Sequence, residues 1–197
     1  MESGKDSLWI KNARLESGFQ EENGRITGTA TKRVHLLLAD GRVEKIVPAS
    51  TPLPQAASYW DADGLLMLPS FREMHIHLDK TFYGGPWQAV IPAPNRFFRI
   101  QQEQELLPRQ LPVAKQRAEG LLHLLQSHGA THVRTHCNID PVIGLQNLEA
   151  TLAALETYRE KLSWEIVAFP QHGLLRSDSV ALVREAMKHG AGLVGGV

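Results

Sequence analysis

Residues 63–79, which read DGLLMLPSFREMHIHLD, mark the point at which this 197-residue chain changes from one kind of structure to another. An apolar run that ends at Pro69 leads into residues 71–77, which we predict to form a β-strand closed by a His-Ile-His triplet. Beyond it, apolar runs alternate with amphipathic stretches, a pattern typical of parallel strands joined by crossover helices. We therefore expect an α/β domain that begins near this strand.

Upstream of this stretch, the sequence predicts a small β module. Its apolar runs are residues 8–10, 34–38 and 43–47. Asp40-Gly41 lies between the last two runs. An Asp-Gly pair in that position favours a type I′ hairpin, because both central residues of the turn need positive φ. We expect residues 1–65 to form this module, and residues 66–197 the α/β domain.

The α/β domain is predicted to continue with alternating elements. The predicted strands are residues 132–136, 165–169 and 193–194, and the predicted helices are residues 113–128, 145–158 and 177–189. Five prolines between residues 84 and 112 predict a long excursion with at most a short helix at 97–106, because proline interrupts helical hydrogen bonding. The similar turns His128-Gly129-Ala130 and His189-Gly190-Ala191 indicate repeated units.

Composition excludes several classes of protein. The chain has 21 basic and 21 acidic residues, and a nucleic-acid surface would need clustered positive charge. No apolar run approaches the length of about 20 residues that spans a bilayer. The single cysteine, Cys137, allows no internal disulfide. We expect a cytoplasmic protein whose partner is neither nucleic acid nor membrane.

The His75-Ile76-His77 triplet is the main candidate site. Residues i and i+2 of a strand face the same side, so both imidazoles can converge on one metal ion. The alternative is a histidine pair on a half-exposed strand face. The C-terminal ends of parallel strands are where such sheets build active sites, which favours the metal interpretation.

Three blocks resemble the amidohydrolase superfamily, and most nearly its cytosine deaminase branch. They are residues 63–79, residues 132–136, and residues 165–171 (EIVAFPQ). The resemblance implies a metal-dependent (β/α)₈ barrel, a TIM-type fold, with a β-sandwich made from both chain ends. It further implies that His75 and His77 bind Zn²⁺ or Fe²⁺, and that Gln171 hydrogen-bonds the substrate.

Residues 132–139 alternate between a polar and an apolar face. We expect the apolar face, which includes Cys137 as a small buried residue, to meet the helices. On the polar face, Arg134 requires a carboxylate partner, either Glu73 or Glu165, and a structural ion network is a better interpretation of it than catalysis. His136 is a candidate site-lining, substrate-binding residue.

Gln171 presents both a donor and an acceptor, which suits a nitrogen heterocycle, although a loop-capping amide is the alternative interpretation. The sequence departs from the cytosine deaminase pattern at three positions. His172 replaces an acid after Gln171, Met74 replaces a proline before the histidine pair, and Lys80 follows Leu78-Asp79. These differences weaken cytosine as the substrate more than they weaken the family.

About four of eight barrel units are present, and the sequence stops at Val197 inside a predicted strand. We expect a truncated barrel that lacks the family's later ligands and acid/base group, and that is inactive alone. The expected whole enzyme deaminates a cyclic nitrogenous compound. The alternatives are an amidohydrolase that releases an N-alkyl amine or opens a ring amide, and a non-catalytic module. A homo-oligomer is compatible with each of them.

Overall fold

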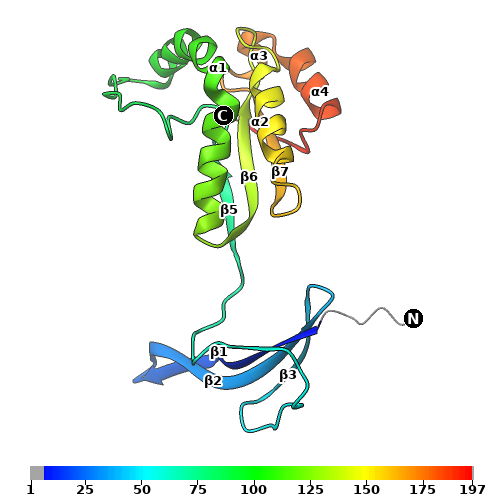
Figure 1. Cartoon of the computed structure of the whole chain (residues 1–197). Coiled ribbons are helices and arrows are strands. Elements are labelled where there is room, and N and C mark those ends of the chain that lie inside the picture. Colours follow the sequence, from blue (N-terminus) through cyan, green and yellow to red (C-terminus); the bar gives the residue numbers. More distant parts are fainter. Residues whose placement is uncertain (1–6, 197) are drawn as a thin grey trace, which may run out of the picture. The chain divides into compact units, whose positions relative to one another are not determined.

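The computed structural model describes residues 7–196. The chain forms two compact units, and the boundary between them in the sequence falls between Pro69 and Ser70 (Figure 1). The boundary predicted from the sequence lies four residues earlier, between residues 65 and 66. Each unit has its own sheet and its own buried core. None of the helices formed by residues 7–196 is both long and apolar enough to span a bilayer.

The first unit is one four-stranded sheet in the order β3-β2-β1-β4. Its strands are β1 (Ser7–Glu22), β2 (Arg25–Ala39), β3 (Arg42–Pro48) and β4 (Tyr59–Asp61). Strands β1, β2 and β3 pair antiparallel, and β4 is parallel to β1. The predicted hairpin is confirmed, because Asp40 and Gly41 connect β2 to β3 with φ values of 52° and 72°.

The second unit is a parallel sheet in the order β5-β6-β7-β8, joined by helices as predicted. Its strands are β5 (Phe71–Ile76), β6 (Ala130–Asn138), β7 (Ser163–Phe169) and β8 (Leu193–Val194). Its helices are α1 (Arg96–Ser127), α2 (Gln146–Glu156), α3 (Leu174–Ser177) and α4 (Val180–Lys188).

The alternation predicted along β6 is confirmed. Val133 and Cys137 belong to the buried cluster that also contains Leu122 of α1 and Leu148 of α2. Arg134 and His136, on the opposite face, are only partly buried. The helices therefore pack on the apolar face of the sheet and leave the polar face for a site.

Helix α1 corrects the sequence analysis. It is one helix of 32 residues with Pro108 and Pro112 inside it, where we expected the prolines to limit the first part to a short helix. An interior proline costs about 3 kcal/mol, but burial of one leucine contributes about 1.5–3 kcal/mol. The buried face continues on both sides of the prolines, so its packing offsets them. Its members are Glu103, Leu107, Gln110, Ala114, Ala118 and Leu122.

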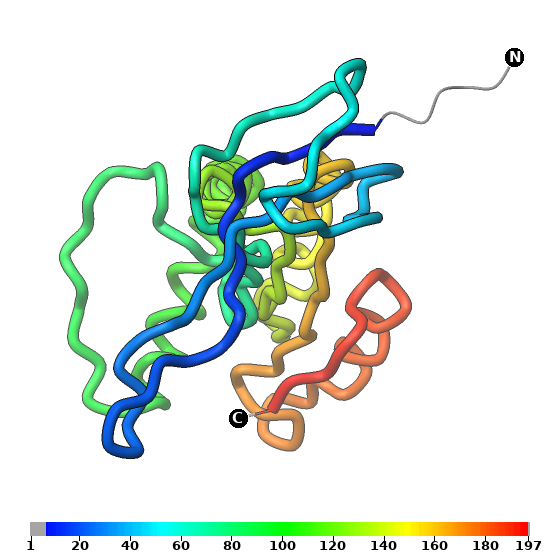
Figure 2. Tube along the Cα trace, turned by 90° about the horizontal axis from the view of Figure 1, so that it is seen from below, coloured from blue at the N-terminus to red at the C-terminus, as the bar shows by residue number. Residues whose placement is uncertain are grey.

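The predicted excursion is therefore confined to the segment before α1, which forms a wide loop (Figure 2). It ends at Asn95, whose side chain accepts a hydrogen bond from the backbone N–H of Phe98 at 3.0 Å and so caps the helix. The helix predicted at residues 177–189 is present as α4, which begins three residues later, at Val180. The short helix α3, which was not predicted, precedes it and ends where Asp178 adopts a left-handed conformation (φ 52°).

The two similar His-Gly-Ala turns have the same structure. His128 and His189 each follow a helix, and the Nδ1 atom of each lies 2.9 Å from the carbonyl oxygen four residues earlier. Gly129 and Gly190 follow with φ values of 88° and 106°. The repetition seen in the sequence is thus a repeated helix-to-strand connection.

Candidate active site

Three imidazoles gather where the parallel strands end. His75 lies in β5, His77 follows that strand directly, and His136 lies in β6. The ring centroids of His75 and His136 are 4.2 Å apart and stacked. His77 is 6.4 Å from His75 and 5.6 Å from His136. Ile76 packs against the helix-side core instead, as strand alternation requires.

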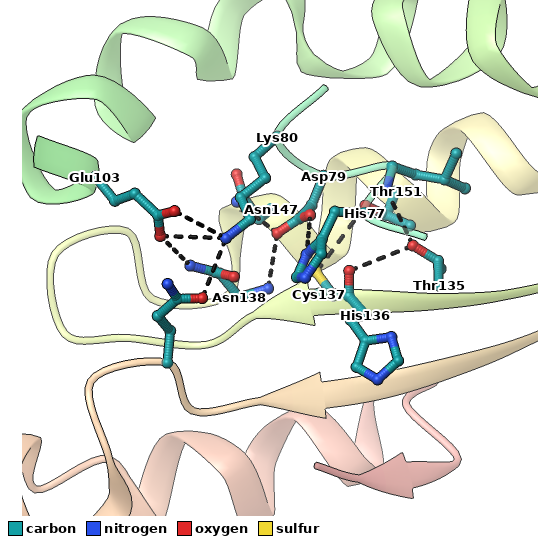
Figure 3. A network of polar contacts seen from close by, with 12 residues as sticks. His77, Asp79, Lys80, Glu103, Thr135, His136, Cys137, Asn138, Asn147 and Thr151 are labelled. Atoms are coloured by element: carbon teal, nitrogen blue, oxygen red, sulfur yellow. Dashed lines mark hydrogen bonds and ion pairs between the residues drawn. The ribbon is translucent and has the colours of Figure 1, made fainter. Parts of the chain in front are cut away.

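Asp79 holds the His77 ring. Its Oδ1 lies 3.1 Å from His77 Nδ1, and its side chain is fully buried (Figure 3). Its Oδ2 accepts hydrogen bonds from the backbone N–H of Asn138 at 2.7 Å and from Nδ2 of Asn147 at 3.1 Å. A carboxylate only accepts, so a neutral His77 carries its proton on Nδ1 and has its lone pair on Nε2.

The surroundings of the His136 ring favour its neutral form. Partial burial lowers the pKa of His136, and the neighbouring histidines lower it further. The ring of Phe169 in β7 stands edge-on to it at 5.8 Å. Within residues 7–196, the buried Nδ1 of His136 has no hydrogen-bond partner. An unpartnered nitrogen in a neutral ring can accept a ligand proton or bind a metal.

The donor set suits a transition metal but is incomplete. Neutral imidazoles are good ligands for zinc and iron, and a carboxylate behind a histidine is a common support for a metal ligand. In the part of the chain that the structure describes, no three His, Cys, Asp or Glu side chains are arranged to hold a metal ion. Cys137 does not contribute, because burial raises the pKa of its thiol well above the usual value.

Gln171 belongs to a second polar group. Its Oε1 accepts a hydrogen bond from Lys80 Nζ at 3.1 Å. The same ammonium lies 3.0 and 3.2 Å from the two carboxylate oxygens of Glu103 in α1. Glu103 in turn accepts from Nδ2 of Asn138, whose backbone N–H bonds Asp79 (Figure 3). A continuous set of hydrogen bonds therefore joins Gln171 to His77.

Gln171 and His172 also line a cavity of about 330 Å³, together with Arg96, Arg176 and Gly195. The three imidazoles of the histidine cluster do not line it. The end of the described chain thus lies beside the loop that follows β7 (Figure 2).

A larger cavity, about 660 Å³, lies between α1 and the preceding loop. Aromatic side chains of the loop, Phe82, Tyr83 and Trp87, line it, but none of the residues described above does. The cavity with these aromatic side chains is therefore separate from the three histidines.

Arg134 forms the structural ion network that the sequence analysis favoured. Its Nε donates to Oε2 of Glu165 at 2.8 Å, and His132 approaches the same oxygen at 3.3 Å. These bonds, first that from Arg134, lower the pKa of Glu165. The other candidate partner of Arg134, Glu73, was a wrong prediction, because its carboxylate accepts a hydrogen bond from the backbone N–H of His75 at 2.9 Å instead.

Sequence reasoning missed the residues that support the site. Asp79 lay inside the quoted motif, two positions after His77, a spacing that could have identified it. Glu103 carried no such signal, because its position depends on the helix that the prolines were expected to interrupt. Asn147 lies in α2, far from the motif in the sequence.

Comparison with known proteins identifies hydrolases among the relatives. No family model matches the chain. It is 47% identical over 196 residues to uncharacterized protein YahJ of Escherichia coli K12, covering 96% of this chain and 42% of that protein. It is 29% identical over 150 residues to N-isopropylammelide isopropyl amidohydrolase of Pseudomonas sp. strain ADP, covering 70% of this chain and 35% of that enzyme. The chain thus spans about two fifths of the length of these relatives.

Two solved structures resemble the chain over 96% of its length. The N-isopropylammelide isopropylaminohydrolase of Burkholderia multivorans has a TM-score of 0.74 at 28% identity, and 44% of it is covered. The 5-methylcytosine deaminase of Klebsiella pneumoniae, liganded with 5-fluorocytosine, has a TM-score of 0.70 at 31% identity, and 43% of it is covered. Apart from the uncharacterized YahJ, the proteins named here are therefore hydrolases and a deaminase, named for N-isopropylammelide and 5-methylcytosine.

Proposed function

We propose that this chain is the N-terminal part of a metal-dependent amidohydrolase of the cytosine deaminase-like branch, which hydrolyses a C–N bond of a cyclic nitrogenous compound. The observation that carries the proposal is the cluster of three imidazoles at the ends of parallel strands, with His77 held by a buried carboxylate. In this proposal β5 to β8 are the first four strands of a (β/α)₈ barrel, and the first unit is part of a β-sandwich. The enzyme is cytoplasmic and its partner is a small molecule.

His75 and His77 would hold the divalent metal, zinc or iron. The chemistry that such a metal supplies when bound is activation of water as a nucleophile toward an sp² carbon. Asp79 keeps the Nε2 atom of His77 available, and His136, whose pKa is lowered by partial burial and the neighbouring histidines, adds a third imidazole to the wall of the site. Gln171 hydrogen-bonds the substrate ring. The remaining ligands and the group that moves protons would come from segments equivalent to the parts of the relatives that this chain does not match.

A second leaving group is favoured by one feature of the chain. His172 stands next to Gln171, where the cytosine deaminase branch has an acid, and two of the similar proteins are named for N-isopropylammelide. Release of an N-alkyl amine is therefore the alternative to release of ammonia. Identification of the amine produced from amino- and alkylamino-substituted pyrimidines and triazines separates the two.

The test uses protein made from the complete reading frame. We expect bound zinc or iron, and metal-dependent hydrolysis of at least one ring in such a panel. His77→Ala should lower metal content and reduce turnover to background. His123→Ala, which changes an exposed histidine of α1, is the matched control and should do neither. Absence of both metal and turnover in the unaltered protein would refute the proposal and favour a non-catalytic module.

A further inference from the structure

Lys80, one of the departures from the family pattern, is a largely buried cation with a fixed set of partners. Its side chain is only 16% exposed. Its ammonium reaches both carboxylate oxygens of Glu103 and the Oε1 atom of Gln171, all within 3.2 Å. An ammonium has three protons to donate, so these contacts use its full capacity. Lys80 therefore has no donor left for a substrate.

Glu103 keeps Lys80 in place from the other side. Its side chain is 10% exposed, and its Oε2 also accepts a hydrogen bond from Nδ2 of Asn138 at 3.2 Å. Asn138 is fully buried at the end of β6. A buried charge pair with additional hydrogen bonds is costly to break, because removal of one partner leaves the other uncompensated. The Lys80 ammonium is thus held in a fixed position beside Gln171.

This arrangement fixes which end of the Gln171 amide faces the substrate. An ammonium cannot accept a hydrogen bond, so a flipped amide would place its NH₂ group against another donor. The carbonyl oxygen must face Lys80, and the NH₂ group is left for the opposite side. No hydrogen bond from Nε2 of Gln171 is made among residues 7–196.

We propose that Lys80 is a positioning residue that makes Gln171 present a hydrogen-bond donor to the substrate. The ring bound at Gln171 should then carry a carbonyl oxygen at that edge, which accepts a hydrogen bond, and not an amino group, which donates one. The inference rests on the proposed function, because it takes Gln171 as a substrate contact. It deepens that function by naming the class of ring that the site selects.

The experiment compares two rings that have either an oxo or an amino group at this edge. Cytosine has an oxo group at position 2 and 2,4-diaminopyrimidine has an amino group there; ammeline and melamine form the equivalent triazine pair. We expect the unaltered enzyme to prefer the oxo ring. Lys80→Met frees the amide to rotate, so kcat/KM for the oxo ring should fall about 10- to 100-fold, mainly through KM. The amino ring should be much less affected.

Further variants separate positioning from folding. Lys80→Arg keeps a donor at this place and should restore part of the preference. Because Lys80→Met leaves Glu103 without a counter-charge, the double variant Lys80→Met/Glu103→Gln keeps the pair neutral and should show the same loss of preference. Gln171→Glu offers only acceptors and should shift the preference toward the amino ring. Lys115→Met, at an exposed lysine of α1, is the matched control.

The outcomes distinguish this inference from the function on which it rests. If the unaltered enzyme turns over a ring but the ratio between oxo and amino rings is the same in every variant, the inference is overturned and the proposed function stands. If no ring is turned over and no metal is bound, the proposed function fails, and the same pairs are then compared by calorimetric binding. Equal affinity of the unaltered protein for the oxo and amino rings would overturn the inference there as well.

Discussion

Asp79 serves the fold and the site at once. Its buried carboxylate joins the end of β5 to β6 through the backbone of Asn138, to α2 through Asn147, and to the ring of His77. These three hydrogen bonds offset the free energy that it costs to remove the Asp79 carboxylate from water. Without the carboxylate, the buried donors would have no acceptor. A side chain that looks like a support for His77 is therefore also a structural cross-link.

Replacement of Asp79 should lower stability strongly. We expect Asp79→Ala to reduce the free energy of unfolding by about 2–4 kcal/mol, because the N–H of Asn138 and the amide of Asn147 lose their buried acceptor. Urea denaturation measures the change. Asp79→Asn, which keeps one carbonyl oxygen, should cost less than Asp79→Ala, and exposed Glu160→Ala should cost almost nothing. Equal effects of the Asp79 and Glu160 changes would contradict this role.

Glu165 should make the protein sensitive to acid. Its pKa is lowered in the folded protein, first by the hydrogen bond from Arg134, so its contribution is present above the ordinary glutamate pKa of about 4.3. That contribution should disappear as the pH falls through the lowered folded-state value. Glu165→Gln should therefore be less stable than the unaltered protein at neutral pH, and the difference should shrink below about pH 4. Chemical denaturation across this range tests it; a difference independent of pH would be the contrary result.

At the scale of elements, the two His-Gly-Ala turns offer a matched comparison. Both glycines have positive φ, a conformation that costs other residues about 1–2 kcal/mol. A Cβ on Gly190 would also lie 3.1 Å from Leu152, whereas one on Gly129 would meet only Phe71 at 3.7 Å. Gly190→Ala should therefore destabilise more than Gly129→Ala in thermal unfolding. If Gly129→Ala proves the more damaging, the crowding by Leu152 is not the cause.

Elements were predictable where the signal was local. The Asp40-Gly41 turn, the alternating faces of β6 and the similar His-Gly-Ala turns after α1 and α4 each depend on a few neighbouring residues. The full length of helix α1 was not predictable from the sequence. Its stability across Pro108 and Pro112 comes from contacts with the sheet and with α2, whose residues lie far from these prolines in the sequence. The same is true of the site: the bond between Lys80 and Gln171 joins residues 91 positions apart.

On the scale of the whole molecule, the second unit has an open sheet. Its edges are β5 and β8, and its helices pack against the side that carries Val133 and Ile166. Parallel sheets usually have both faces covered and their edges protected. Val194 on β8 is 54% exposed, so an apolar edge is available for pairing.

We expect the 197-residue chain, purified alone, to self-associate through this edge. Light scattering coupled to size exclusion should give a mass above that of one chain, rising with concentration. Val194→Lys places a charge on the edge and should reduce association. Met187→Lys, on the exposed surface of α4, is the control and should change little. A single-chain mass at every concentration would contradict the expectation.

The position of Cys137 gives the molecule a built-in chemical reporter. It is the sole cysteine of the sequence, and its side chain is sealed between β6 and the helices that cover it. A thiol reagent can reach it only when that layer opens, because its high pKa and its burial both suppress reaction in the closed state. The rate at which the Cys137 sulfur is alkylated therefore measures how often the helices separate transiently from the sheet. Mass spectrometry can follow this alkylation in the native protein without an introduced label.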